Sequence, residues 1–162
     1  MKPLVLDTTF ILPLFGIELT KPKEIKKYLP TILDHGVQGF DIYLPNTCLL
    51  ETMYLLNREF RKTKNSAILN RFSRLLPTLF NSKYLKLLDP IQIPEAMIIA
   101  NKIREAGHTD LLDCLIAATA IYLEGIFVTM DKQLIKIIRS IEELEKIEIL
   151  TWSEFRKEIT RV

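Results

Sequence analysis

Short apolar segments alternate with longer segments of helical periodicity along the whole chain, and this alternation constrains the fold more strongly than any other feature. Segments with the length and composition of buried strands lie at 3–7, 41–45, 84–90, 126–129 and 147–151. Segments with helical spacing or helix boundary signals lie at 8–15, 23–34, 46–60, 65–81, 93–106, 109–124 and 131–143, and a short helix is expected at the end of the chain. Strands that alternate with helices predict a parallel sheet covered on both faces. We therefore expect one domain over residues 1–162 with a three-layer α/β/α architecture.

Particular residues mark the ends of several expected helices. Thr109 is a good N-cap for a helix that runs to about Glu124, and Gly125 is a good stop for that helix. Pro77 lies inside the segment 65–81, where it is expected to kink the helix or end it early, because proline removes a helical hydrogen bond.

Composition excludes several classes of protein. Hydrophobic residues make up 48% of the chain and charged residues 26%, which is typical of a globular protein rather than a disordered one. No apolar run approaches the roughly 20 residues of a membrane span, and an acid interrupts the N-terminal run too early for a signal peptide. We expect a cytoplasmic protein with no membrane contact. Cys48 and Cys114 are expected to be buried free thiols, and together with the distant His35 and His108 they are too few for a zinc site.

Two of the expected strands are followed by an aspartate. Asp7 ends the apolar run LVLD, and Asp131 comes two residues after the run IFVT. In open parallel sheets, ligands bind beyond the carboxyl ends of the strands, at the point where the strand order reverses. If these two strands are neighbours at that point, both carboxylates face one crevice, and this edge of the sheet becomes the candidate site.

Two further acids interrupt apolar helical segments. Glu51 lies within CLLETMYLL, and Asp113 lies within LLDCLIAATA. A buried carboxylate without a partner is costly, and carboxylates that converge raise the pKa of one another. A divalent cation resolves both problems, and carboxylate oxygens select hard cations such as Mg²⁺ or Mn²⁺. The four acids therefore predict a Mg²⁺ or Mn²⁺ site.

Each acid taken alone also has a structural explanation. Asp7 or Asp131 can cap the helix that follows it, and Glu51 can lie near a helix N-terminus because of the helix dipole. These explanations account for single residues, whereas a shared crevice accounts for all of them.

For Asp110 and Asp113, both a ligand role and a structural role are open. Asp110 lies three residues before Asp113, so both can share one helix face. Asp110 is either an additional ligand, acting through a metal-bound water, or a first-turn carboxylate that stabilises the helix without a functional role. Asp113 can also pair with Arg104 or Lys102.

Three segments carry a family resemblance: LVLDTTFIL near the N-terminus, LPNTCLLETMYLL in the middle, and DCLIAATAIYLEGIFVTMDKQL near the C-terminus. With these segments the chain resembles PIN-domain nucleases, a family that includes the VapC-type toxins of toxin–antitoxin pairs. The resemblance spans almost the whole chain. The third segment is the most specific, since the separation of 18 residues between Asp113 and Asp131 is typical of the family.

The resemblance implies both a topology and a set of site residues. It implies a five-stranded parallel sheet of order 3-2-1-4-5, which places the first and fourth strands side by side. Its four catalytic and metal-binding acids would be Asp7, Glu51, Asp113 and Asp131. Thr129 corresponds to the hydroxyl residue that often precedes the last acid by two, and Thr8 matches the small hydroxyl residue after the first acid.

The chemistry that remains open to such a site is metal-assisted hydrolysis of a phosphodiester. Neither His35 nor His108 is placed to act as a base beside a Ser or Cys, and no Gly-rich phosphate loop is present. A phosphatase of the haloacid-dehalogenase type would need a second Asp where Thr9 stands, and a response-regulator receiver would need paired acids after the first strand. A catalytically inactive PIN-like scaffold or RNA-binding module stays open as the alternative. RNA as the substrate, single-stranded or structured, follows from the resemblance alone.

The expected partners rest on charge and on excess apolar surface. The net charge of +2 leaves no strong nucleic-acid footprint, but the run NREFRKTK at 57–64 is basic. It supplies Arg58, Arg61, Lys62 and Lys64, which are either a solvated helix end or phosphate contacts for RNA. The helices at 45–60 and 65–81 are more apolar than one sheet face requires, which predicts a homodimer interface or a groove for an antitoxin protein.

Overall fold

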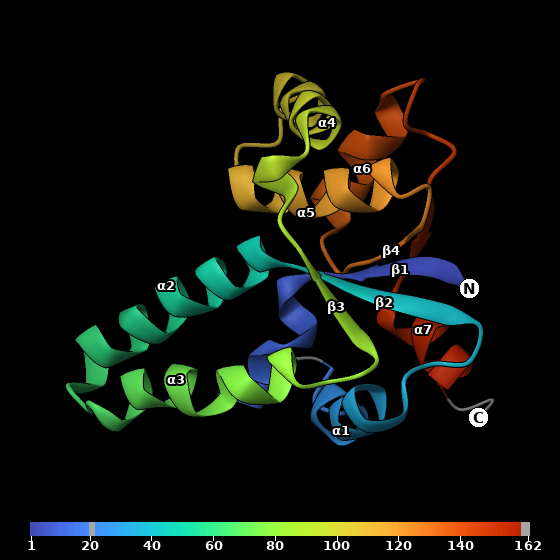
Figure 1. Ribbon diagram of the computed structural model, residues 1–162. Coiled ribbons are helices and arrows are strands. Elements are labelled where there is room, and N and C mark those ends of the chain that lie inside the picture. Colours follow the sequence, from blue (N-terminus) through green and yellow to red (C-terminus); the bar gives the residue numbers. More distant parts are fainter. Residues whose placement is uncertain (20–21, 160–162) are drawn as a thin grey trace.

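The computed structural model describes residues 1–19 and 22–159 and contains a five-stranded, fully parallel sheet of order β3-β2-β1-β4-β5 (Figure 1). Its strands are β1 (Lys2–Leu6), β2 (Phe40–Pro45), β3 (Leu85–Leu88), β4 (Ile126–Val128) and β5 (Glu148–Leu150). The α-helices are α1 (Ile25–His35), α2 (Asn46–Thr63), α3 (Ala67–Phe80), α4 (Pro94–Glu105), α5 (Leu111–Tyr122), α6 (Lys132–Ser140) and α7 (Trp152–Ile159). Short 3₁₀ helices are η1 (Thr8–Phe10), η2 (Leu12–Phe15) and η3 (Pro90–Gln92). The expected architecture and strand order are confirmed.

Strand β1 is the centre of the sheet because it pairs with both β2 and β4. Leu4 lies opposite Ile42 on one side and opposite Ile126 on the other. Leu4, Val5 and Leu6 are buried, as expected for a strand covered on both faces. This pairing brings the carboxyl ends of β1 and β4 together, so the residues that follow the two strands become neighbours.

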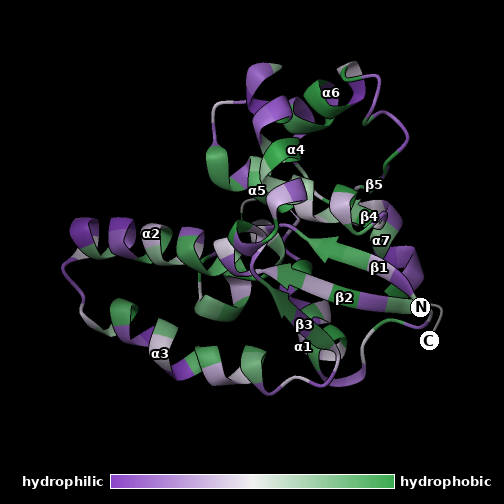
Figure 2. Cartoon of the chain, turned by 45° about the horizontal axis from the view of Figure 1, so that its top comes forward, coloured by the Kyte–Doolittle hydropathy of each residue, from purple (hydrophilic) through white to green (hydrophobic). Residues whose placement is uncertain are grey.

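The two faces of the sheet are covered by different helices (Figure 1). Helices α4, α5 and α6 lie on one face, where α5 packs against β1, β2 and β4. Small side chains such as Ala117, Ala118 and Ala120 are buried in this contact. On the other face, Phe10 packs against Trp152 of α7, with ring centroids 5.9 Å apart. Figure 2 shows the hydrophobic residues concentrated in the central strands.

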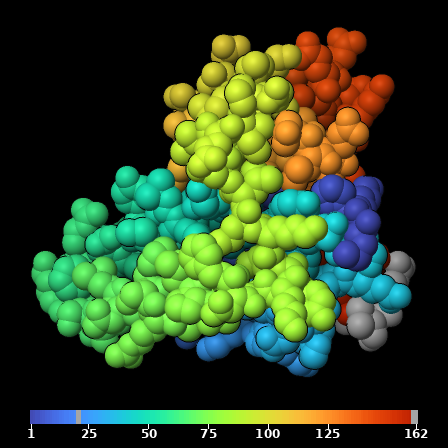
Figure 3. Space-filling view, viewed as in Figure 1, coloured from blue at the N-terminus to red at the C-terminus, as the bar shows by residue number. Residues whose placement is uncertain are grey.

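Helices α2 and α3 form a hairpin that projects from the rest of the molecule like an arm (Figures 1 and 3). The base of the arm is fixed where α2 contacts α5 and η1. Because Glu51 lies in the second turn of α2, this base also positions a predicted site residue.

One expected helix boundary is wrong, and one of the two outcomes expected at Pro77 does not occur. Helix α3 does not end early at Pro77 but continues to Phe80, because the fully buried Leu79 holds its last turn against the core. The N-cap of α5 is Asp110 rather than Thr109, since the Asp110 carboxylate accepts bonds from the backbone of Leu112 and Asp113.

Other sequence expectations are confirmed. Both cysteines are free and buried. Gly125 follows α5 as expected, and a side chain there would meet the Pro3 carbonyl oxygen at 2.7 Å, so β4 can approach β1 only with glycine at this position. Within the part of the chain that the structure describes, none of the helices combines the length and the apolar character that crossing a membrane requires.

Candidate functional site

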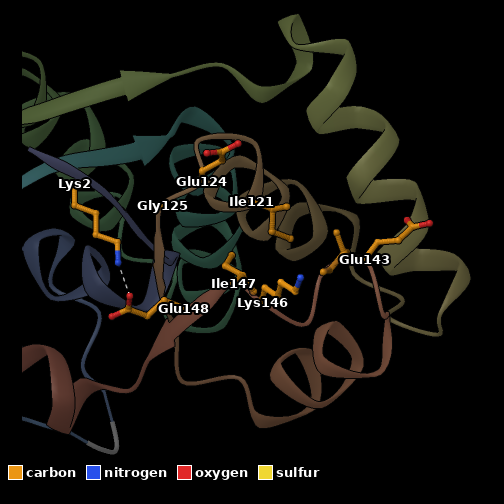
Figure 4. Close-up of a pocket in the computed structure, with 9 residues that line it drawn as sticks. Lys2, Ile121, Glu124, Gly125, Glu143, Lys146, Ile147 and Glu148 are labelled. Carbon is orange, nitrogen blue, oxygen red and sulfur yellow. Dashed lines mark hydrogen bonds and ion pairs between the residues drawn. The ribbon is translucent and has the colours of Figure 1, made fainter.

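A pocket at the amino ends of the strands contains two acids that are already paired (Figure 4). Residues of β1, the end of α5 and the start of β5 line this pocket. Within it, Glu148 pairs with Lys2, and Glu143 pairs with Lys102 of α4. Mutual neutralisation leaves these carboxylates with little need of a ligand. The four acids predicted from the sequence lie toward the opposite edge of the sheet, at the carboxyl ends of the strands.

Asp7 lies at the carboxyl end of β1, where its backbone N–H donates to the Val128 carbonyl of β4. Its side chain is only 8% exposed, and both carboxylate oxygens accept hydrogen bonds. Oδ1 accepts from the Thr8 backbone N–H, and Oδ2 accepts from the Thr129 hydroxyl, each at 2.7 Å. Burial raises the pKa of Asp7 to about 7; the Thr129 hydrogen bond opposes this shift, and the charges of Asp113 and Glu51 add to it.

Thr129 connects Asp7 to Asp131. While its hydroxyl donates to Asp7, the same oxygen accepts a hydrogen bond of 3.1 Å from the Asp131 backbone N–H. Asp131 also caps α6, since its Oδ1 accepts from the backbone of Gln133 and Leu134 at 2.8 and 2.9 Å. One carboxylate oxygen carries both capping bonds, so a structural role for Asp131 does not use up its ligand capacity.

Asp113 lies in the first turn of α5 and is half-buried. Its Oδ2 lies 3.1 Å from Nε2 of His108, in the turn that enters α5, while Lys102 pairs elsewhere. Burial raises the pKa of Asp113, the hydrogen bond from His108 lowers it, and the charges of Asp110 and Asp131 raise it. The expected pairing of Asp113 with Lys102 or Arg104 is replaced by this contact with His108.

Glu51 approaches the same region from α2. Its Oε2 is buried and has no hydrogen-bond partner among the described residues, and the same is true of the nearby Thr8 hydroxyl. Burial raises the pKa of Glu51, the neighbouring Thr8 hydroxyl lowers it, and the charges of Asp113 and Asp110 raise it. An orphaned, buried carboxylate oxygen is costly unless a ligand satisfies it.

The carboxylates therefore converge from four parts of the chain on one region of the molecule. Among the described residues, no Lys or Arg side chain forms an ion pair with these acids: Asp7, Glu51, Asp113 and Asp131. One ligand atom each from His108, Asp113 and Asp131 lies within 4.8 Å of the others. Carboxylate oxygens without a Lys or Arg partner, one of them without a hydrogen-bond donor, are suited to a hard divalent cation. The donor set is thus suited to Mg²⁺ or Mn²⁺.

The sequence model of the PIN domain family matches residues 4–139, which include all four acids. The chain belongs to the PIN domain family. This confirms the family that the sequence motifs indicated.

Solved structures share this PIN fold at low sequence identity. The FitAB complex bound to an IR36 DNA fragment is 16% identical with a TM-score of 0.58, covering 92% of this chain and 94% of that chain. FitAcB from Neisseria gonorrhoeae is 18% identical with a TM-score of 0.56, covering 91% and 96%. DNA-bound VapBC from Salmonella typhimurium is 19% identical with a TM-score of 0.53, covering 94% and 99%. The chain has no significant match among curated protein sequences.

Sequence reasoning missed one residue of the candidate site. His108 was considered only as a base beside a Ser or Cys and as a zinc ligand, and its contact with Asp113 was not predicted. The signal was its place five residues before Asp113 and two before the true helix cap, Asp110. With Thr109 taken as the cap, the turn that folds His108 back onto α5 is not apparent.

The basic run lies away from the carboxylates of the PIN domain. At a rise of about 1.5 Å per residue, Arg58 lies about 10 Å and Lys64 about 20 Å beyond Glu51 along α2. All four basic side chains are exposed, and Lys62 pairs with Glu59. The run therefore occupies the outer half of the α2–α3 arm, which Figure 2 shows as strongly hydrophilic at its tip.

Proposed function

We propose that this PIN domain is a divalent-cation-dependent endoribonuclease that hydrolyses phosphodiester bonds of RNA. The observation that carries the proposal is the convergence of a buried and three half-buried carboxylates that form no ion pair with a described Lys or Arg. Burial raises the pKa of Asp7 to about 7, and the Glu51 Oε2 has no hydrogen-bond partner among the described residues. An arrangement that strains its acids in this way is stabilised by bound positive charge. Membership of the PIN domain family supports nuclease chemistry at this site.

Asp7 and Asp113 are assigned as the central ligands of Mg²⁺ or Mn²⁺, and Asp131 and Glu51 as the ligands that complete the shell, partly through water. When bound, such a cation lowers the pKa of a water molecule and neutralises charge on the scissile phosphate. Thr129 orients Asp7, because its hydroxyl holds Oδ2 while Oδ1 is held by the Thr8 backbone. Asp110 caps α5 and thereby fixes the backbone at Asp113.

The basic side chains of α2 are assigned to RNA binding outside the site. Arg58, Arg61, Lys62 and Lys64 lie along the outer part of the helix that carries Glu51. An RNA strand held on this helix would present its phosphates toward a site that is itself acidic, so basic contacts outside the site offset the repulsion. The proposal includes a single domain over residues 1–162.

We assign the protein to the toxin component of a VapBC-type pair, with an antitoxin protein and a second copy of the chain as partners. The similar structures include FitAB and VapBC assemblies, and the sequence motifs resemble VapC-type toxins. The arm also exposes apolar side chains beside Glu51: Leu50, Met53 and Tyr54. Such a patch on a helix is suited to a protein partner.

Cleavage of labelled RNA by the purified protein tests the proposal. Single-stranded and structured RNAs of mixed sequence are incubated with Mg²⁺, with Mn²⁺ or with a chelator. Asp113→Asn is compared with Asp34→Asn, a matched control at an exposed aspartate on α1. Cation-dependent cleavage that Asp113→Asn loses and Asp34→Asn retains supports a nuclease. Equal cleavage by both variants, or none with either cation, contradicts the proposal.

A further inference from the structure

His108 is a buried residue beside the proposed site, and the roles assigned to the four acids leave its function open. It lies between α4 and α5 and is only 6% exposed. Its backbone is held at both ends, because its N–H donates to the Ile103 carbonyl and its carbonyl accepts a weak bond from the Cys114 thiol. The ring is buried on this fixed backbone, and its Nε2 lies 3.1 Å from Asp113 Oδ2.

The distance alone allows two roles for the imidazole. Nε2 can donate its hydrogen to Asp113, or it can bind the same cation as Asp113. Two adjacent ligands of an octahedral ion bound at about 2.1 Å lie about 3 Å apart, which is close to the separation observed here. The clustering of His108, Asp113 and Asp131 ligand atoms within 4.8 Å is compatible with either role.

The position of the ring proton separates the two roles. If Nε2 binds a cation, the neutral ring carries its proton on Nδ1. Nδ1 is buried and has no hydrogen-bond partner among the described residues. Histidines that bind metals almost always donate this second N–H to a carboxylate, carbonyl or water, and buried donors without a partner are rare. With the proton on Nε2, the donor is satisfied by Asp113, and only a lone pair on Nδ1 stays unpaired.

We propose that His108 is a positioning residue that donates its Nε2–H to Oδ2 of Asp113 and is not itself a ligand of the cation. This inference rests on the proposed function of the carboxylate site. The hydrogen bond uses one lone pair of Oδ2 and leaves the rest of the Asp113 carboxylate, Oδ1 included, for the cation. Asp110 fixes the Asp113 backbone, and His108 fixes its carboxylate. The cation is then held by oxygen alone, which favours Mg²⁺ and Mn²⁺ over Zn²⁺.

Nitrogen NMR of the metal-free protein tests the tautomer directly. The chain has two histidines, so the ring of His108 is assigned by comparison with His35→Gln, which alters the exposed histidine at the end of α1. At a pH where both rings are neutral, we expect the His108 proton on Nε2. A proton on Nδ1 would overturn the proposal without any variant at His108.

Binding of Mn²⁺, followed by electron paramagnetic resonance, tests the role toward the cation. We expect no imidazole nitrogen coupling to Mn²⁺ in the wild-type protein. His108→Leu is expected to weaken Mn²⁺ binding about 10-fold or more, while His108→Gln, which keeps an N–H donor, and His35→Leu stay near wild type. Nitrogen coupling, or full affinity in a folded His108→Leu variant, overturns the inference. A wild-type protein that binds no Mn²⁺ instead overturns the proposed function on which the inference rests.

Discussion

The Thr129 hydroxyl donates a 2.7 Å hydrogen bond to Oδ2 of Asp7, across 122 residues of sequence. The same hydroxyl oxygen accepts from the Asp131 backbone N–H. A single buried side chain of β4's carboxyl end thus sets the orientation of one proposed ligand and the backbone of another. Thr129 is therefore the residue through which the two strand ends form one site.

Thr129→Val is expected to lower both stability and cleavage, because it leaves a buried Asp7 oxygen without its donor. The expected loss in the free energy of unfolding is about 1–3 kcal/mol. Urea denaturation and RNA cleavage measure the two effects. Thr129→Ser keeps the hydroxyl and is the matched control; a Val variant as stable and active as the Ser variant would contradict the role assigned to the hydroxyl.

The metal-free protein is expected to become less stable as the pH rises from 4 to 8. The folded pKa of Asp7 is raised from 3.8 to about 7, so the folded state binds a proton that the unfolded state has released. The stability contributed by this proton is fully present below pH 4 and is lost as the pH passes through 7. A shift of this size corresponds to at most about 4 kcal/mol. Urea denaturation in chelator, compared with Asp7→Asn, measures it; an equally steep dependence in Asp7→Asn would refute the assignment.

Addition of Mg²⁺ or Mn²⁺ is expected to stabilise the protein at pH 8, because bound positive charge offsets the repulsion among the acids. At a cation concentration 100 times Kd, the gain in the free energy of unfolding is about 2.7 kcal/mol. Thermal unfolding with and without each cation measures the gain. Asp131→Asn should reduce it while Asp34→Asn leaves it intact, and equal gains in both variants would place the cation elsewhere.

Asp110 offers a way to separate capping from ligand roles. Asp110→Ala removes the cap of α5 and is expected to cost about 1 kcal/mol of stability. Asp110→Asn retains the cap but not the charge. If Asp110 is only a cap, Asp110→Asn recovers both the stability and the cleavage that Asp110→Ala loses. If Asp110→Asn recovers the stability but not the cleavage, the Asp110 carboxylate belongs to the site.

The basic run on α2 is expected to contribute to RNA affinity rather than to chemistry. Replacement of Arg58 and Arg61 by alanine should weaken RNA binding and lower the dependence of log K on log salt by about 0.7 per lost phosphate contact. Mn²⁺ affinity should not change. Lys23→Ala, just before α1, combined with Lys26→Ala on α1 is the control, and an equal loss of RNA binding there would indicate general charge attraction only.

The sequence determines most of this fold through features that act locally. The apolar run ending at Asp7 and the one before Thr129 predict buried strands and place hydroxyl and carboxylate groups at their ends. The order of the strands came from the family motifs, because periodicity does not fix which strands are neighbours. The contact of His108 with Asp113 could not be predicted, since it depends on the turn geometry set by the true cap, Asp110. Pro77 shows the converse, because tertiary packing of the last turn of α3 overrides a local signal.

The strand order has a further consequence for the time at which the site comes into existence. The ligands are separated by most of the chain, and they meet only after β4 has added to β1 and after α2 and α5 have docked on the sheet. Contacts of such high sequence separation form late in folding, after the loop-closure entropy has been overcome. A nascent chain that has not yet reached Asp131 can hold β1, β2 and β3 but has no complete carboxylate cluster. The proposed activity therefore cannot begin before β4 and Asp131 have been synthesised and have joined the sheet.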